Sequence, residues 1–146
     1  MSSKDKAAKQ LKIAAKRKKI SGINGDISAK RASQASIDEK IEDLKEAAQN
    51  LKTLTASLND YKATLDSELS KIDDNTFKGD RRKKYDEKVK DAKTSLNTIK
   101  KGHADNLITI NKKIVELQAK SDSLGTSISN LSLSVSNLNL QIAALQ

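Results

Sequence analysis

The sequence predicts an all-α protein, a long antiparallel helical hairpin in which two helices form a coiled coil. Apolar residues recur alternately three and four positions apart over almost the whole chain, which places them on one side of an α-helix. Proline is absent and only five of the 146 residues are glycine, so residues that break helices are scarce. One short polar stretch around Gly79 interrupts the pattern, and a short connection makes two helices antiparallel neighbours.

The first long helix is predicted over residues 20–72. We call the stripe of side chains that faces the other helix the seam. In the first half of the chain its positions are Ile13, Ile20, Ile27, Gln34, Ile41, Ala48 and Thr55, together with Ile23, Lys30, Ile37, Leu44, Leu51, Leu58, Leu65 and Ile72. The Asn24-Gly25 pair is a turn signal. The three-and-four spacing of seam residues nevertheless continues from Ile20 through Ile23 to Ile27, so we expect a bent or frayed helix there and not a break. Ala47, Leu54 and Tyr61 are expected to widen the seam by one position.

Residues 73–80 are predicted to form the turn, because Asp, Asn and Thr side chains accept hydrogen bonds from the free amides of a helix start. The second helix is predicted over residues 81–146. Its seam reads Tyr85, Val89, Ala92, Leu96, Ile99, Leu107, Ile110, Ile114, Leu117, Ser121, Leu124, Ile128, Leu131, Val135, Leu138, Ile142 and Leu145. Two successive steps of four, from Ile99 through His103 to Leu107, predict a stutter at which the supercoil relaxes.

Residues 1–19 are predicted to form a basic arm that is frayed or disordered, with a helical arm left open because Leu11, Ala14 and Ala15 favour helix. The arm carries eight of the chain's 28 basic residues, and Asp5 is its only acid. Such an arm can bind an anionic membrane, nucleic acid or an acidic partner, and it can equally be a solvated terminus. It has no aromatic side chain to stack on bases, which argues against nucleic acid and leaves a membrane surface as an open alternative.

A second apolar face is expected on the second helix. Four aliphatic residues outside the seam lie within about 40° of one another at about 100° per residue: Ile108, Val115, Leu133 and Leu140. The seam lies on roughly the opposite side of this helix. We therefore predict that these residues bind a helical partner or a second copy, which completes a bundle of three or four helices. The alternative is a scatter of surface leucines, which is common.

The sequence offers no chemistry for an enzyme. It has no cysteine and a single histidine, His103, which fits a seam position, so neither a metal site nor a cofactor is expected. Two helices alone also lack the concave pocket that acid–base catalysis needs. The sequence contains no run of about 18 apolar residues, the length needed to span a membrane. No apolar core follows the basic N-terminus, as it would in a secretory signal. We expect a cytoplasmic protein, with export together with a partner left open.

The turn carries a family resemblance. Phe77-Lys78-Gly79 stands between two long helices where W-x-G proteins of type VII (ESX) secretion have Trp-x-Gly, and Tyr85 resembles an aromatic on that family's second helix. The chain is most similar to the longer, small helical partner proteins encoded beside LXG toxins in Gram-positive bacteria. The resemblance implies that Phe77 and Gly79 pack the hairpin end. The family's export signal, Tyr followed four residues later by Asp or Glu, is missing.

These observations lead to one hypothesis and two alternatives. The resemblance implies a non-enzymatic protein that binds the helical targeting domain of a type VII secreted LXG toxin and acts as its targeting or chaperone-like factor. The alternatives are a structural coiled coil that assembles with itself, and a coiled coil whose basic arm docks on nucleic acid or an anionic membrane. Co-purification with a helical partner, homo-oligomerisation and salt-dependent binding distinguish the three.

Overall fold

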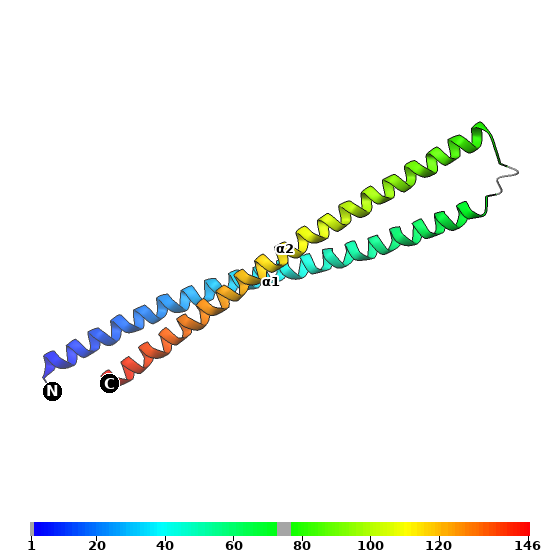
Figure 1. The fold of residues 1–146 in the computed structure, drawn as a ribbon. Coiled ribbons are helices and arrows are strands. Elements are labelled where there is room, and N and C mark those ends of the chain that lie inside the picture. The colour runs from blue at the N-terminus through cyan, green and yellow to red at the C-terminus, as the bar shows by residue number, and fades with distance from the viewer. Residues whose placement is uncertain (1, 73–76) are drawn as a thin grey trace. The chain divides into compact units, whose positions relative to one another are not determined.

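The computed structural model describes residues 2–72 and 77–146 and contains two helices, α1 (Ser3–Ser70) and α2 (Asp80–Leu145). The two helices pack against each other and no strand occurs among the described residues, which confirms the predicted all-α helical hairpin (Figure 1). Residues 73–76, part of the predicted turn, lie outside the described residues. Over the described parts of the chain, neither helix offers a stretch that is both long and apolar enough to cross a lipid bilayer.

The first helix begins at Ser3, so residues 3–19 are helical, where the sequence predicted a frayed or disordered arm. A reciprocal cap explains the early start. The Asp5 amide donates to Ser2 Oγ at 3.1 Å, while the Asp5 carboxylate accepts from the Ser2 amide at 3.2 Å and from Ser2 Oγ at 2.6 Å. This arrangement satisfies amides that a helix start otherwise leaves unpaired. The helix also continues through Gly22 and Gly25 without a break.

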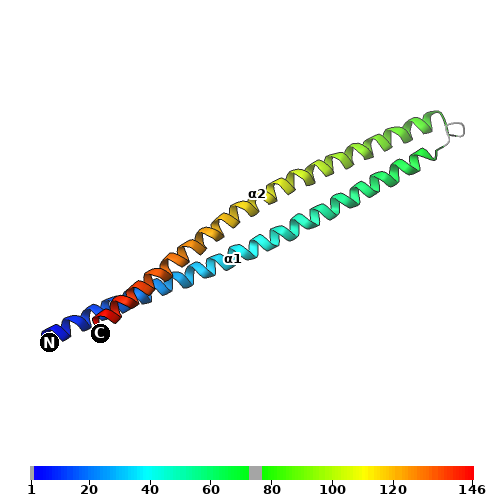
Figure 2. The ribbon, with the colours of Figure 1, turned by 60° about the horizontal axis from the view of Figure 1, so that its bottom comes forward.

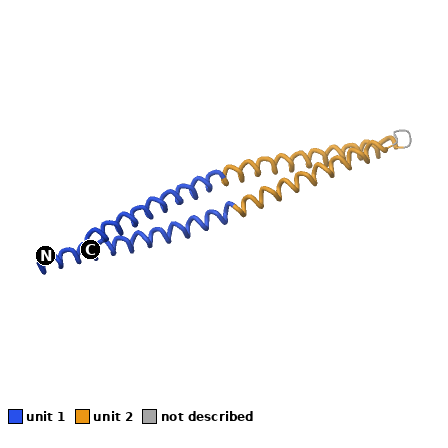
Figure 3. Tube along the Cα trace, turned by 90° about the horizontal axis from the view of Figure 1, so that it is seen from below, with its two compact units in different colours: residues 1–41, 115–146 blue, residues 42–114 orange. Residues whose placement is uncertain are grey.

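Each helix contributes to two compact units. Unit 1 consists of residues 1–41 and 115–146, and unit 2 consists of residues 42–114. Within each unit a segment of α1 runs beside a segment of α2 in the opposite direction (Figures 2 and 3). Both chain termini belong to unit 1.

The seam of unit 1 lies where the spacing predicts it. Its most buried apolar side chains are Ile13, Ile27, Ile41, Leu117, Ile128, Leu138 and Ile142, each at most 9% exposed. The seam extends into the basic segment. Lys16 and Lys9 lie seven and 14 residues before the seam residue Ile23, and both are half-buried. Long lysine side chains can cover apolar surface with their stems while the ammonium group stays in water.

The seam of unit 2 departs from the prediction on α2. Lys93 and Lys100 are half-buried there, whereas Ala92 is exposed and Ile99 is 46% exposed. Successive seam residues are therefore four positions apart twice in a row from Tyr85 through Val89 to Lys93, which places the stutter there. The stutter predicted at His103 is absent. Lysine stems can occupy seam positions, and Lys93 Nζ also reaches Asp66 Oδ1 on α1 at 2.8 Å.

On the α1 side of unit 2, the expected widening of the seam is also wrong for two residues. Leu54 is 53% exposed and Tyr61 is 57% exposed, while Ala47 is half-buried. The narrow seam between two helices buries only the residues that are spaced alternately three and four positions apart. Side chains one position further round the helix therefore remain in solvent.

Candidate partner-binding surfaces

The four residues of the predicted second face are all exposed on α2. Ile108, which belongs to unit 2, is 54% exposed. In unit 1, Val115 is 70%, Leu133 is 63% and Leu140 is 69% exposed. The packing of α1 against α2 thus leaves their apolar surface in water. Burying a leucine completely is worth roughly 1.5–3 kcal/mol, so this surface can contribute free energy to binding.

The part of α2 that carries Leu133 and Leu140 is itself uncharged, since no charged residue follows Asp122. Two nearby hydroxyl groups, those of Ser134 and Ser136, are already paired within α2. Ser134 Oγ donates to the Asn130 carbonyl and Ser136 Oγ donates to the Ser132 carbonyl, both at 3.2 Å. A partner can cover these hydroxyls without leaving a buried donor unpaired, which lowers the cost of desolvation.

A groove lies between α1 and α2 in unit 1, near the two ends of the chain. It has a volume of about 590 Å³ and is lined by Lys12, Ala15 and Lys16 of α1 and by Gln141, Ala144 and Leu145 of α2. Lys16 Nζ donates to Gln141 Oε1 at 2.7 Å, which holds the lysine against α2. A second groove of about 530 Å³ is lined by Lys6, Lys9, Gln10, Ile13, Leu145 and Gln146. Both grooves therefore combine apolar α2 surface with basic α1 side chains.

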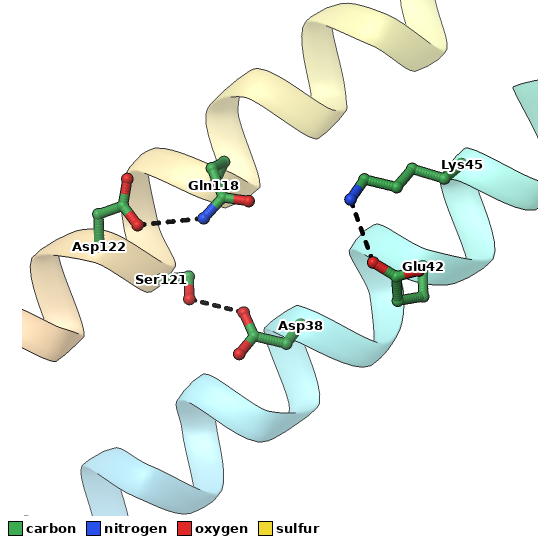
Figure 4. A network of polar contacts seen from close by, with 6 residues as sticks. All are labelled: Asp38, Glu42, Lys45, Gln118, Ser121 and Asp122. Atoms are coloured by element: carbon green, nitrogen blue, oxygen red, sulfur yellow. Dashed lines mark hydrogen bonds and ion pairs between the residues drawn. The ribbon is translucent and has the colours of Figure 1, made fainter.

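A polar layer (Gln34, Asp38 and Ser121) interrupts the apolar seam of unit 1. Ser121 is only 4% exposed, and its Oγ donates to Asp38 Oδ1 at 2.6 Å (Figure 4). Gln34 Nε2 donates to the Ser121 carbonyl at 3.0 Å. The missing side chain of Gly125 makes room for this amide, because a Cβ there would stand 3.2 Å from Gln34 Nε2. Asp38 is itself exposed and the contact is partly buried, and a polar contact of this kind within a seam favours one register of two helices.

The turn residues singled out by the sequence lie at the start of α2. The Phe77 ring packs edge-on against the Tyr85 ring with centroids 5.6 Å apart, and the Arg82 guanidinium carbon lies 5.7 Å from the Phe77 centroid. Gly79 has a φ of 80°, a conformation that favours glycine. Its carbonyl accepts from the Lys83 amide at 3.0 Å, which starts the helix.

In the unit 2 seam, His103 is half-buried, as its seam position predicts. Its Nδ1 lies 3.4 Å from Thr55 Oγ1, and Thr55 Oγ1 also donates to the Leu51 carbonyl at 2.9 Å. A groove of about 300 Å³ lies here, lined mainly by apolar atoms of residues that include Leu51, Ala56, Ala104 and Leu107. The surface is thus hollowed beside His103.

Sequence reasoning missed one exposed apolar side chain and the two grooves of unit 1. Leu11 is 73% exposed, and its position outside both seam sets was the signal that could have found it. The grooves depend on the antiparallel register, which brings residues 12–16 beside residues 141–145. Periodicity along one helix does not specify that register.

Comparison with known proteins places the chain in a family. No curated protein sequence matches it. The family model described as YwqH-like matches residues 18–140, which covers nearly all of α1 after the basic segment and most of α2. On this match, the chain belongs to the YwqH-like family.

Proposed function

We propose that this protein is a non-enzymatic binding protein that pairs with a helical partner in the cytoplasm and serves as a targeting or chaperone-like factor for a secreted LXG toxin. The observation that carries the proposal is the exposed pair Leu133 and Leu140, on a helix whose other side is already packed. Family membership supports the toxin assignment, because YwqH-like proteins are associated with LXG toxin systems. The further link to W-x-G proteins and type VII secretion rests on Phe77, Gly79 and Tyr85.

The proposed mechanism is completion of a helical bundle. A partner helix lies along the exposed side of α2 in unit 1 and buries Leu133 and Leu140 against its own apolar stripe. Each leucine contributes about 1.5 kcal/mol or more if burial is complete. The partner's stripe is covered at the same time, so an apolar helix of the toxin stays in solution until export. No bond is made or broken in this role.

The test is co-expression of the chain with the helical targeting domain of an LXG toxin. We expect a complex that survives size-exclusion chromatography, and we expect Leu133→Asp combined with Leu140→Asp to abolish it. Leu54→Asp combined with Tyr61→Asp is the matched control, because these apolar residues are also exposed and seven positions apart, but lie on α1 in unit 2. Circular dichroism should show unchanged helix content in both variants.

Two outcomes contradict the proposal. One is a complex that survives the two α2 substitutions, which would mean that the leucines are not the interface. The other is a chain that ignores the toxin domain and instead forms a homo-oligomer whose mass in light scattering rises with concentration. The second result favours a self-assembling coiled coil, for which a second copy would cover the same leucines.

A further inference from the structure

We propose that the partner helix carries acidic residues along one edge of its apolar stripe. This inference rests on the proposed function and deepens it by naming the chemistry of the partner. The surface concerned is the basic-edged face of unit 1, which consists of Leu133, Leu140 and Ala144 of α2 together with Lys12 and Lys16 of α1.

The geometry joins the apolar and basic parts of this face. Leu140 lies one helical turn before Ala144, on neighbouring positions of the α2 surface. Ala144 in turn lines the groove whose α1 wall carries Lys12 and Lys16. A helix that lies along Leu133 and Leu140 and also covers Ala144 therefore has one edge directed toward the groove and its lysine side chains. Lys16 is held in place there by its hydrogen bond to Gln141.

Among the residues that the structure describes, none of the eight basic residues between Lys4 and Lys19 forms an ion pair. The nearby carboxylate of Asp5 is engaged with Ser2. Unit 1 holds 12 basic and six acidic residues, and the α2 segment after Asp122 adds no charge of either sign. A carboxylate-bearing edge on the partner supplies the missing charges.

The positive charge of this face also argues against a second copy of the chain as the partner. Two copies that meet here bring two lysine-rich segments of the same sign together, which opposes association at low salt. A membrane surface fits less well than a helix. Helices that lie on membranes bury Trp, Phe and Leu side chains, but all three aromatic residues of this chain lie in unit 2.

The experiment uses two designed peptides of about 20 residues, long enough for about five helical turns. Both carry the same leucine stripe, and the stripe is edged by Glu in one and by Lys in the other. Binding to the full chain is followed by fluorescence anisotropy. We expect the Glu peptide to bind at least about tenfold more tightly at low salt. The preference should shrink when salt rises to about 0.5 M, because the charges are then screened.

Variants of the chain assign the preference to the proposed lysines. Lys12→Glu combined with Lys16→Glu should reverse it, so that the Lys peptide binds more tightly. Lys83→Glu combined with Lys84→Glu is the control, because it changes the net charge equally at exposed positions in unit 2. Acidic residues suit the first turn of α2. This control should retain the preference for the Glu peptide.

Equal binding of the two peptides, stronger binding of the Lys peptide, or no binding of either overturns the inference. So does a preference that survives Lys12→Glu with Lys16→Glu. Tight binding of the chain to vesicles of anionic phospholipid without any peptide preference also overturns it, and assigns the lysines to a membrane surface. If the toxin domain is lost on substituting the leucines but kept on substituting the lysines, the proposed function stands and the acidic edge fails.

Discussion

The two units share one spacing pattern but bury different side chains. Among the described residues, seven of the nine most buried apolar side chains belong to unit 1, and unit 2 contributes only Ala48 and Leu96. In the seam set of Ile13, unit 1 has isoleucine at every position except Gln34, whereas unit 2 has Ala48 and Thr55. On α2, unit 2 also places Lys100 and His103 in the seam. Position in a heptad thus decides which side a residue faces, while residue type decides how much free energy that position contributes. We expect unit 1 to be the more stable and unit 2 to open first.

Truncating a buried isoleucine of unit 1 is the strongest test of this difference. Ile27 is 7% exposed, so Ile27→Ala should lower the free energy of unfolding by about 3 kcal/mol through lost burial and an unfilled space. Ile99→Ala in unit 2 is the control, because Ile99 is 46% exposed, and it should cost under about 1 kcal/mol. Urea denaturation followed by circular dichroism measures both values. Equal losses would mean that the two units are equally well packed.

Glycine replacements come next in size. An added Cβ at Gly22 or Gly25 meets no atom within 4 Å, so Gly22→Ala with Gly25→Ala should stabilise α1 by about 2 kcal/mol in total. Gly125→Ala should give no such gain, because its Cβ would press on Gln34 Nε2 and weaken the bond to the Ser121 carbonyl. The same urea experiment compares the two variants. A full gain at Gly125 would show that the polar layer tolerates the methyl group.

Replacing the half-buried histidine of the unit 2 seam by an apolar residue should have a smaller effect. His103→Leu replaces a half-buried ring whose contact to Thr55 Oγ1 is long, and Thr55 keeps its bond to the Leu51 carbonyl. We expect a gain of about 1 kcal/mol from the added apolar burial. Hydrogen exchange should show slower opening of amides in unit 2 and little change in unit 1. A loss of stability would mean that the histidine contact matters more than its length indicates.

The sequence predicted the hairpin and the exposure of Leu133 and Leu140, because both follow from about 100° of rotation per residue. It left the helical state of the basic segment open, since a run of charges hid the seam positions of Lys9 and Lys16 and the Ser2–Asp5 cap. The stutter was placed wrongly because lysines were not counted as seam residues, although Lys93 and Lys100 occupy that role. The polar layer needs knowledge of which residues face each other across the seam. Spacing along one helix does not contain that knowledge.

The smallest expected effect concerns two exposed carboxyl groups, one in each unit. The hydrogen bond from Lys93 lowers the pKa of Asp66 below its ordinary value of 3.8, and hydrogen bonds from Ser2 lower the pKa of Asp5 in the same direction. A carboxyl whose pKa is lower in the folded state stabilises that state above its unfolded pKa. This stability is lost as the pH falls through the lower folded value. Both contributions are therefore present at neutral pH and disappear below about pH 4.

The two groups differ in what their shift reports. The Asp66 shift depends on α1 and α2 being paired in unit 2, whereas the Asp5 shift depends on a cap local to α1. Lys93→Met should return the NMR titration midpoint of Asp66 to its ordinary range and leave that of Asp5 unchanged, and Ser2→Ala should do the reverse. If Asp66 titrates normally in the unsubstituted chain while Asp5 remains shifted, then the helices of unit 2 are separated at Lys93 in solution. That result would make unit 2 weaker than its ion pair indicates.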